Sequence, residues 1–208
     1  MIIDISEYQN VTSYPQVLAS GVQGVIARAT IGQAGLDKDF LYRTDAIPPL
    51  NVYFGQYTVI KPLEDPIKQA DWFLENICHL KQISPWGDWE WTSADGQSEK
   101  EWTQLTAKDR IDFFFAFQQE IRLNLKGFVP GIYTNPYFWN QYFEGLDITP
   151  YRLWIASNKK DTPLLPNKCT NWTLWQYGSG QVQGVDGDVD LNKVNDGVEL
   201  ASLVCQVP

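Results

Sequence analysis

Asp88 and Glu90 stand two positions apart in the aromatic run 86–91, which reads WGDWEW. In a β-strand, residues i and i+2 point to the same face, so both carboxylates would project together, with their backbones roughly 6–7 Å apart. Like charges that close, beside large apolar rings, raise one pKa and leave a protonated acid next to an ionised partner. Such a pair can cleave a glycosidic bond. The plainer interpretation is a solvated acidic pair on an edge strand.

Segments with the patterns of strands and helices alternate through most of the 208-residue chain. Apolar content and flanking turn residues predict strands at 2–5, 24–30, 52–60, 86–91 and 128–133. Apolar stripes and capping residues predict helices at 14–20, 37–47, 65–80, 106–125 and 135–142. Three more strands, without clear helices between them, are predicted at 152–156, 173–177 and 185–191. The polar segment 92–102 is predicted to be a loop.

This order of elements predicts an α/β fold with a parallel sheet, because alternating strands and helices place successive strands side by side in one direction. Eight strands indicate a closed barrel of the TIM type, although 208 residues make a short one. No internal repeat, linker or change of composition marks a boundary. Residues 1–208 are therefore expected to form a single domain.

A barrel of this type carries its functional groups at the C-terminal ends of its strands. Besides the pair at 88 and 90, Asp4 lies at the end of the first predicted strand and Asp190 near the end of the last. The ends of the third, fifth and seventh strands supply Tyr57, Tyr133, Gln176 and Tyr177. The four acids and these polar and aromatic side chains are therefore expected to converge on one rim.

The composition limits the classes of partner. Hydrophobic residues make up 44% of the chain and charged residues only 20%, which favours a folded domain over disorder. The net charge of -9 repels phosphate backbones, so nucleic acid is not an expected partner. The nine Trp and ten Tyr residues can stack on sugar faces, but most of them are expected to fill the core.

The cysteines and the hydropathy pattern bear on the compartment. Cys78, Cys169 and Cys205 are too widely spaced for a disulfide framework, which fits synthesis in a reducing cytoplasm. The chain starts directly in an apolar strand, and no signal peptide is visible in it. No apolar run approaches the roughly 20 residues that span a bilayer, so membrane insertion is not expected.

Neither a metal nor another cofactor is expected. His79 is the single histidine, it falls in a predicted helix far from the acidic motifs, and no CxxC pair occurs, which argues against a zinc site. The acidic run 186–192 superficially resembles a calcium loop. Leu191 and Gly197, however, occupy the positions that need Gly and a bidentate Glu, so a polar turn before the final strand is the preferred interpretation.

The motifs together resemble the family 25 glycoside hydrolases, the lysozymes of many phage endolysins and bacterial autolysins. Several short runs, in the same order as in the family and covering essentially the whole chain, carry the resemblance. They are IDISEYQ at 3–9, VIARAT at 25–30, DWE at 88–90, PGIYTN at 130–135, LWIA at 153–156, WQY at 175–177, GVDG at 184–187 and VDLN at 189–192. Each run alone is weak, and the ordered set is specific.

The resemblance implies a (β/α)5β3 barrel that hydrolyses the β-1,4 bond between N-acetylmuramic acid and N-acetylglucosamine in peptidoglycan. It implies Glu90 as general acid, Asp88 as its partner, and Asp4 with Asp190 as the remaining acidic pair. The substrate-binding residues that it suggests are Tyr57, Tyr133, Trp154, Gln176 and Tyr177. The expected protein is a monomer that acts on peptidoglycan glycan strands in the bacterial cell wall. Like an endolysin, it would reach the wall through a separate lysis factor or non-classical export.

Two positions depart from the family pattern. The family often has an acid after the second-strand Ala-Thr, where this chain has Ile31 and Gly32. The third strand often ends in Tyr-His-Phe, and here Thr58 takes the histidine position. These changes bear on sugar contacts and on glycan preference, and they leave the acidic pair intact.

Two other functions remain open at this level. The chain could be a non-catalytic glycan-binding module on a decayed hydrolase barrel, although retention of all four acids argues against decay. It could also be a chitinase-like hydrolase of a related amino-sugar polymer.

Asp88 could activate water, or it could orient a substrate N-acetyl group that attacks the anomeric carbon, and the sequence leaves both routes open.

Overall fold

Eight strands form a closed ring in the computed structural model, which describes residues 1–77, 82–92 and 96–205. In order around the barrel they are β1 (Ile2–Ile5), β11 (Asp188–Val194), β9 (Leu174–Gln181), β8 (Arg152–Ala156), β7 (Gly131–Thr134), β6 (Gln82–Trp89), β5 (Tyr53–Val59) and β3 (Gly24–Ile31). Pairing between β3 and β1 closes the ring. The strand β11 is antiparallel to both of its neighbours, and the other barrel pairs are parallel.

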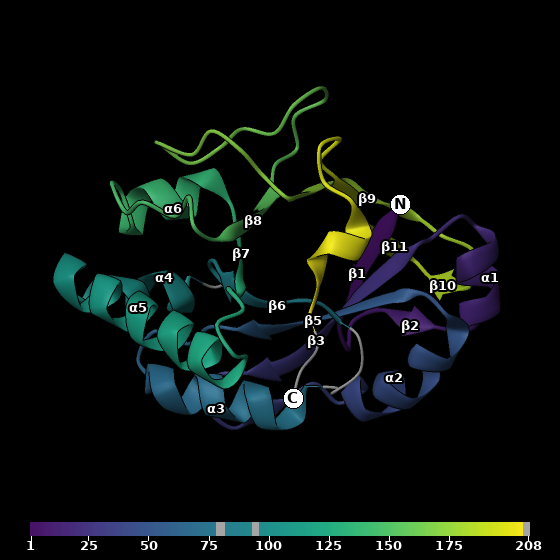
Figure 1. Cartoon of the computed structure of the whole chain (residues 1–208), viewed down its shortest axis with the longest axis horizontal. Helices are drawn as coiled ribbons and strands as arrows, with labels where there is room; N and C mark the ends of the chain where they lie inside the picture. Colours follow the sequence, from purple (N-terminus) through teal and green to yellow (C-terminus); the bar gives the residue numbers. More distant parts are fainter. Residues whose placement is uncertain (78–81, 93–95, 206–208) are drawn as a thin grey trace.

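Helices cover the outside of the first five parallel strands (Figure 1). Each of these strands is followed in the chain by a helix: α1 (Tyr14–Ala19), α2 (Phe40–Ala46), α3 (Pro66–Asn76), α5 (Ala107–Asn124) and α6 (Pro136–Tyr142). No helix lies between β8, β9 and β11 in the part of the chain described (Figure 1). The predicted (β/α)5β3 barrel is confirmed.

Shorter elements complete the fold. They are β2 (Asn10–Val11) paired with β10 (Val185–Asp186), β4 (Gly35–Leu36) paired with β3, β12 (Val204–Cys205) paired with β6, and the 3-10 turns η1 (Pro48–Leu50) and η2 (Leu200–Leu203).

Capping residues explain where the helices begin. Thr106, the predicted N-cap of the long helix α5, accepts a hydrogen bond from the backbone of Asp109, whose side chain bonds back to the Thr106 backbone. Asp65 caps α3 through two backbone N–H groups, and a proline occupies the first turn. Asn135 caps α6 by accepting a 2.9 Å bond from the backbone of Phe138. These caps fix where the helices that follow β5, β6 and β7 begin. The three strands themselves carry residues of the candidate site.

The segment 92–102, predicted to be a loop, contains part of a helix, α4 (Gln97–Gln104). The prediction was wrong because only one large apolar side chain of this polar helix is buried. Trp102 is fully buried and packs with its ring centroid 6.2 Å from Trp89 and 5.3 Å from Phe138. A single anchor of this kind leaves no apolar stripe in the sequence.

The ends of the last strands also differ from the prediction. Gly187 has a φ of 79°, which interrupts the backbone between β10 and β11, so the final strand begins at Asp188 rather than at 185. The strand β9 extends to Gln181, and Gln176 is therefore an inner residue of that strand, not one at its end. The predicted helix 65–80 ends at Asn76, and its predicted last turn lies outside the described residues.

Aromatic side chains dominate the core. Between the barrel and α5, Trp89 lies within 5.1–6.0 Å of the ring centroids of Phe113, Phe114 and Phe117. Inside the barrel, Trp154 contacts the rings of other residues edge to face. The core role expected for most tryptophans is confirmed. Six of the nine are fully buried: Trp86, Trp89, Trp102, Trp139, Trp154 and Trp175.

The thiols of Cys169 and Cys205 are free. Cys78 and His79 lie outside the described residues, so the expectations that concern them are not tested. Among the described helices, none combines the length and the apolar content that crossing a membrane would require.

Candidate active site

A pocket of about 90 Å³ opens at the rim of the barrel where the parallel strands end. Eight of the nine predicted site residues line it: Asp4, Tyr57, Asp88, Glu90, Tyr133, Trp154, Gln176 and Asp190. Tyr177 is not among the described residues that line the pocket. It follows Gln176 in the strand and therefore points to the other face, where its ring lies 6.2 Å from that of Trp175.

The strand order brings the four carboxylates together. Asp88 is the last residue but one of β6, and Glu90 comes directly after that strand. Asp4, in β1, lies directly opposite Asp190 of β11 in the antiparallel register. The expectation that Asp190 lies near the end of the last strand was wrong. Because β11 runs in the opposite direction, it is the N-terminal half of this strand that reaches the rim.

A chain of hydrogen bonds fixes Asp4. Its Oδ2 accepts a 2.7 Å bond from Asn192 Nδ2 and a 3.0 Å bond from Gln176 Nε2. The Gln176 amide oxygen in turn accepts from the Tyr133 hydroxyl at 2.9 Å, and Asn192 Oδ1 accepts from Trp154 Nε1 at 2.7 Å. Asp4, Asn192 and Trp154 are all buried. The network holds the Asp4 carboxylate, and with it one side of the pocket, in a single orientation.

Asn192 is a site residue for which the sequence analysis proposed no role. It belongs to the run VDLN and stands two positions after Asp190. The sequence did contain a signal for this residue. Asn192 is a polar side chain in a strand with a buried face, and burying its amide without a hydrogen-bond partner would be costly, which predicts a partner.

Asp88 is buried, and among the described residues its Oδ1 has no hydrogen-bond partner. Burial raises the pKa of Asp88 well above its usual value, and the nearby Glu90 and Asp4 carboxylates raise it further. Charges on Arg28 and Lys61 oppose this increase. Asp88 thus lines the pocket and carries a buried acceptor atom that a hydrogen-bond donor would stabilise.

Glu90 is half-buried, and burial raises its pKa from 4.5 to about 7. A side-chain hydrogen bond from Asn135 lowers this pKa, while the Asp4 and Asp190 charges raise it. Asn135 uses its oxygen to cap α6, so the side-chain NH₂ group is the part that faces Glu90. A carboxyl group with a pKa near 7 can donate a proton at neutral pH.

The other two acids are also shifted. Burial and the Asp190 charge raise the pKa of Asp4 to about 7, against the lowering effect of its bonds to Asn192 and Gln176. Burial raises the pKa of Asp190 as well. The expectation of one raised and one ordinary acid at 88 and 90 was therefore wrong, because both side chains are removed from water at this rim.

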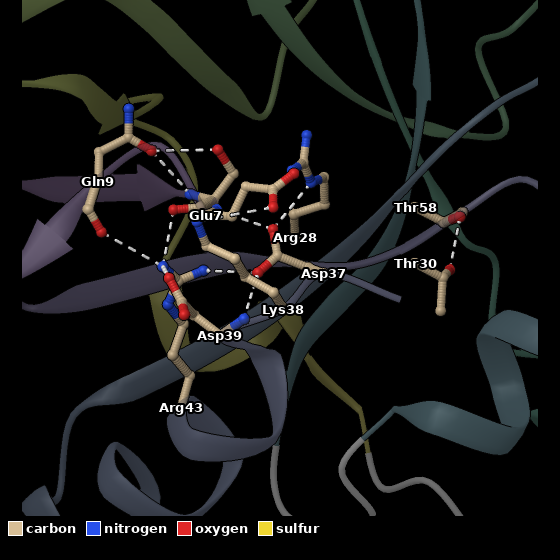
Figure 2. Close-up of polar contacts among 10 residues, drawn as sticks. Glu7, Gln9, Arg28, Thr30, Asp37, Lys38, Asp39, Arg43 and Thr58 are labelled. Carbon is tan, nitrogen blue, oxygen red and sulfur yellow. Dashed lines mark hydrogen bonds and ion pairs between the residues drawn. The ribbon is translucent and has the colours of Figure 1, made fainter. Parts of the chain in front are cut away.

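The two departures from the family pattern have distinct surroundings. Thr58 is buried, and its hydroxyl forms a 2.7 Å hydrogen bond with that of Thr30, away from the pocket lining (Figure 2). Beside Gly32, the Glu64 carboxylate accepts a 2.6 Å bond from the backbone of Gln33. A side chain at position 32 would overlap this carboxylate.

The acidic run after residue 185 forms strands and does not form an ion-binding loop. Asp186 lies in β10 and accepts a 2.7 Å hydrogen bond from Asn10 of the paired strand. Within residues 1–77, 82–92 and 96–205, no group of three or more acidic, histidine or cysteine side chains is arranged to hold a metal ion.

A lysozyme and a muramidase are among the solved structures that share this barrel. The crystal structure of the bacterial lysozyme from Streptomyces coelicolor matches with a TM-score of 0.84 and 24% identity, over 97% of this chain and 93% of that one. The muramidase from Acremonium alcalophilum matches with a TM-score of 0.82 and 23% identity, over 97% and 96% of the two chains. Identities this low show a shared fold.

The sequence comparisons identify the family. Lysozyme M1 of Streptomyces globisporus is 39% identical over 69 residues, which cover 31% of this chain and 23% of that protein. This chain thus matches less than a quarter of its curated relative's length. The family model described as Glycosyl hydrolases family 25 matches residues 3–185. Because that match spans most of the sequence and agrees with the barrel, the chain belongs to glycosyl hydrolases family 25.

Proposed function

We propose that this protein is a peptidoglycan hydrolase that cleaves the β-1,4 bond between N-acetylmuramic acid and N-acetylglucosamine. Membership of glycosyl hydrolases family 25 supports the reaction class, and the names of the similar proteins, lysozymes and muramidases, support the polymer. The observation that carries the proposal is the meeting in one pocket of Glu90, whose pKa is about 7, and Asp88, whose buried Oδ1 has no hydrogen-bond partner among the described residues.

In this proposal Glu90 is the general acid. It protonates the glycosidic oxygen as the bond to the anomeric carbon breaks, so that the leaving sugar departs as a neutral alcohol. A pKa of about 7 keeps the group about half protonated in neutral solution and mostly protonated in mildly acidic solution. The hydrogen bond from Asn135 holds the carboxyl group in place without removing its proton.

Asp88 acts on the other side of the anomeric carbon. Its unpartnered oxygen suits the N–H of a substrate N-acetyl group, whose carbonyl oxygen would then attack that carbon, and an attacking water is the alternative occupant. Either donor stabilises the ionised form of Asp88 and lowers its raised pKa. Binding of substrate would thus leave the proton of the pair on Glu90, where the reaction needs it.

Asp4 and Asp190 stabilise the positive charge that develops on the sugar ring. Both line the pocket, and the hydrogen bonds to Asp4 prevent it from turning away. In their ionised forms, carboxylates held in this way act on a transition state without reorganisation, and the bonds from Asn192 and Gln176 favour the ionised form of Asp4. Of the three aromatic rings that line the pocket, that of Tyr57 is partly exposed and can contact a pyranose, while those of Tyr133 and Trp154 are buried.

A chitinase-like activity is the second candidate, because an acceptor for an N-acetyl group serves any N-acetylated sugar. Purified peptidoglycan and colloidal chitin should be digested in parallel, and the new reducing ends identified after borohydride reduction. Reduced N-acetylmuramic acid from peptidoglycan is the expected product. Reduced N-acetylglucosamine, from either polymer, would instead support the second candidate.

The same assay separates an enzyme from a binding module. Glu90→Gln should bind walls normally and release few reducing ends, and Glu75→Gln, a change at an exposed position of α3, should behave as wild type. Wall binding without turnover by the wild-type protein would reject hydrolysis and favour the module. We further propose that residues 1–208 act as one catalytic domain, as a monomer, on glycan strands of the bacterial wall.

A further inference from the structure

The connection that follows β1, residues 6–9, is held by buried charged side chains from elsewhere in the fold (Figure 2). Asp37, which is fully buried, accepts a 2.8 Å hydrogen bond from the backbone of Glu7. Arg43, from α2, donates to the backbone carbonyl groups of Ser6 at 2.7 Å and Gln9 at 3.4 Å. These contacts fix the path of a short rim loop that has little regular structure of its own.

Arg28 links this loop to the barrel wall. From β3, its guanidinium donates to Asp37 at 2.9 Å and to the Glu7 carboxylate at 2.7 Å (Figure 2). The same guanidinium lies 5.2 Å from the ring centroid of Tyr8, over the ring face. Arg28 is itself buried, so its stacking on Tyr8 takes place at the edge of a fixed ion-pair cluster.

Tyr8 is 78% exposed, which is unusual for a large ring on a loop held this firmly. Since the guanidinium covers part of one ring face, the rest of the ring is available to solvent. A ring whose orientation is already fixed can stack on a flat apolar partner with little loss of conformational entropy.

The position of Tyr8 relates it to the pocket. It stands four residues after Asp4, on the rim where the parallel strands end. In the parallel register of β3 and β5, Arg28 lies opposite Tyr57, which lines the pocket. Arg28 therefore connects the strands that line the pocket with Tyr8, and the Tyr8 ring stands on the same rim as the pocket.

We propose that the Tyr8 ring is a stacking platform for a sugar of the glycan strand next to the sugars held at Asp88 and Glu90. This proposal rests on the proposed function. The C–H face of a pyranose is flat and apolar, and it can lie on the exposed part of the ring. Because the cluster of Arg28, Asp37 and Glu7 has already ordered the loop, binding loses little conformational entropy there.

The test compares Tyr8→Ala and Tyr8→Phe on long glycan strands and on a short chromogenic N-acetylated disaccharide. The matched control is Tyr53→Ala, because Tyr53 begins β5 and so lies at the opposite end of the barrel. On long strands Tyr8→Ala should raise KM about 3- to 10-fold with little change in kcat. Tyr8→Phe and Tyr53→Ala should match wild type, and the disaccharide should show no difference.

Binding can be measured apart from turnover by placing Tyr8→Ala in the Glu90→Gln background and determining Kd for long strands by calorimetry. A weaker Kd supports the platform, and an unchanged Kd and KM with normal wild-type turnover reject it. A loss of kcat on both substrates would also reject it, since that pattern indicates a displaced pocket. Absence of wild-type turnover would reject the proposed function, while the Kd comparison would still decide the role of Tyr8.

Discussion

Asn192 donates a 2.7 Å hydrogen bond from its side-chain amide to Oδ2 of Asp4, a residue 188 positions away in the chain. The amide oxygen of Asn192 accepts from the indole N–H of Trp154 at 2.7 Å. One buried side chain therefore satisfies a carboxylate and a tryptophan at the same time, so the two groups depend on each other for their positions.

Asn192→Ala should raise the pKa of Asp4 above its value of about 7, because the lost hydrogen bond is one of those that lower it. The free energy of unfolding should fall by about 1–3 kcal/mol, since Asp4 and Trp154 each lose a buried partner. Carboxyl NMR titration and denaturant unfolding measure the two effects. Asn124→Ala, on the exposed end of α5, is the control. An unchanged Asp4 titration would contradict the assigned role.

The protein should become less stable as pH rises through the neutral range. Asp4 and Glu90 have pKa values raised from 3.8 and 4.5 to about 7, so the folded state binds more protons than the unfolded state between these values. The free energy of unfolding therefore decreases from about pH 4 to about pH 7.

Glu90→Gln removes the contribution of Glu90 to this decrease. Above pH 7 its melting temperature should equal or exceed that of wild type, while hydrolysis falls about 10²–10⁴-fold because no proton can be transferred. Differential scanning calorimetry at pH 5 and pH 8, beside a wall turbidity assay, provides both readings. Hydrolysis by the folded variant at more than about a tenth of the wild-type rate would remove Glu90 from the role of acid.

Asn135→Ser should shift the pH dependence of hydrolysis without breaking α6, because serine is also a good N-cap. If Glu90 must be protonated, kcat/KM falls as pH rises through its pKa of about 7. The Asn135 bond lowers that pKa, so its loss should move the alkaline limb of the profile to higher pH. If the Asn135→Ser variant has a normal melting temperature and its pH profile of kcat/KM coincides with that of wild type, the Asn135 hydrogen bond does not control the pKa of Glu90.

Asp37→Asn should cost several times more stability than a similar change at the surface. Asp37 is fully buried between Arg28 and Arg43, and neutralising it leaves buried positive charge, at a cost of about 3–5 kcal/mol. The matched control is Asp112→Asn, which breaks the exposed pair with Lys108 and should cost about 1 kcal/mol or less. Equal losses in urea unfolding would show that water screens the buried cluster.

The sequence predicted the barrel well because strands and helices of this fold carry strong apolar periodicities. Because the ends of parallel strands meet at one rim, seven of the eight pocket residues could also be placed together, and the family resemblance supplied the eighth, Trp154. The direction of β11 could not be read in this way, because an apolar strand pattern is the same in both directions. The argument from strand ends therefore placed Asp190 at the correct rim for the wrong reason.

What the sequence did not predict depends on contacts between distant segments. Helix α4 was missed because Trp102 is its one large buried anchor. Asn192 and Asp37 are ordinary polar residues until the fold buries them beside Asp4 and Arg28. The sequence predicted one raised and one ordinary pKa at positions 88 and 90. The pKa of Asp88 is raised as well, chiefly by burial, which local sequence does not report.

The direct opposition of Asp4 and Asp190 in the β1–β11 pair has a consequence for biosynthesis. During synthesis, Asp4 leaves the ribosome long before Asp190. The strand β1 can pair with β11 only after the residues between them have been made. A nascent or proteolytically shortened chain that ends before β11 would contain Asp88 and Glu90 but only one side of the pocket. If the proposed function holds, hydrolytic activity should therefore appear only after β11 has joined the barrel.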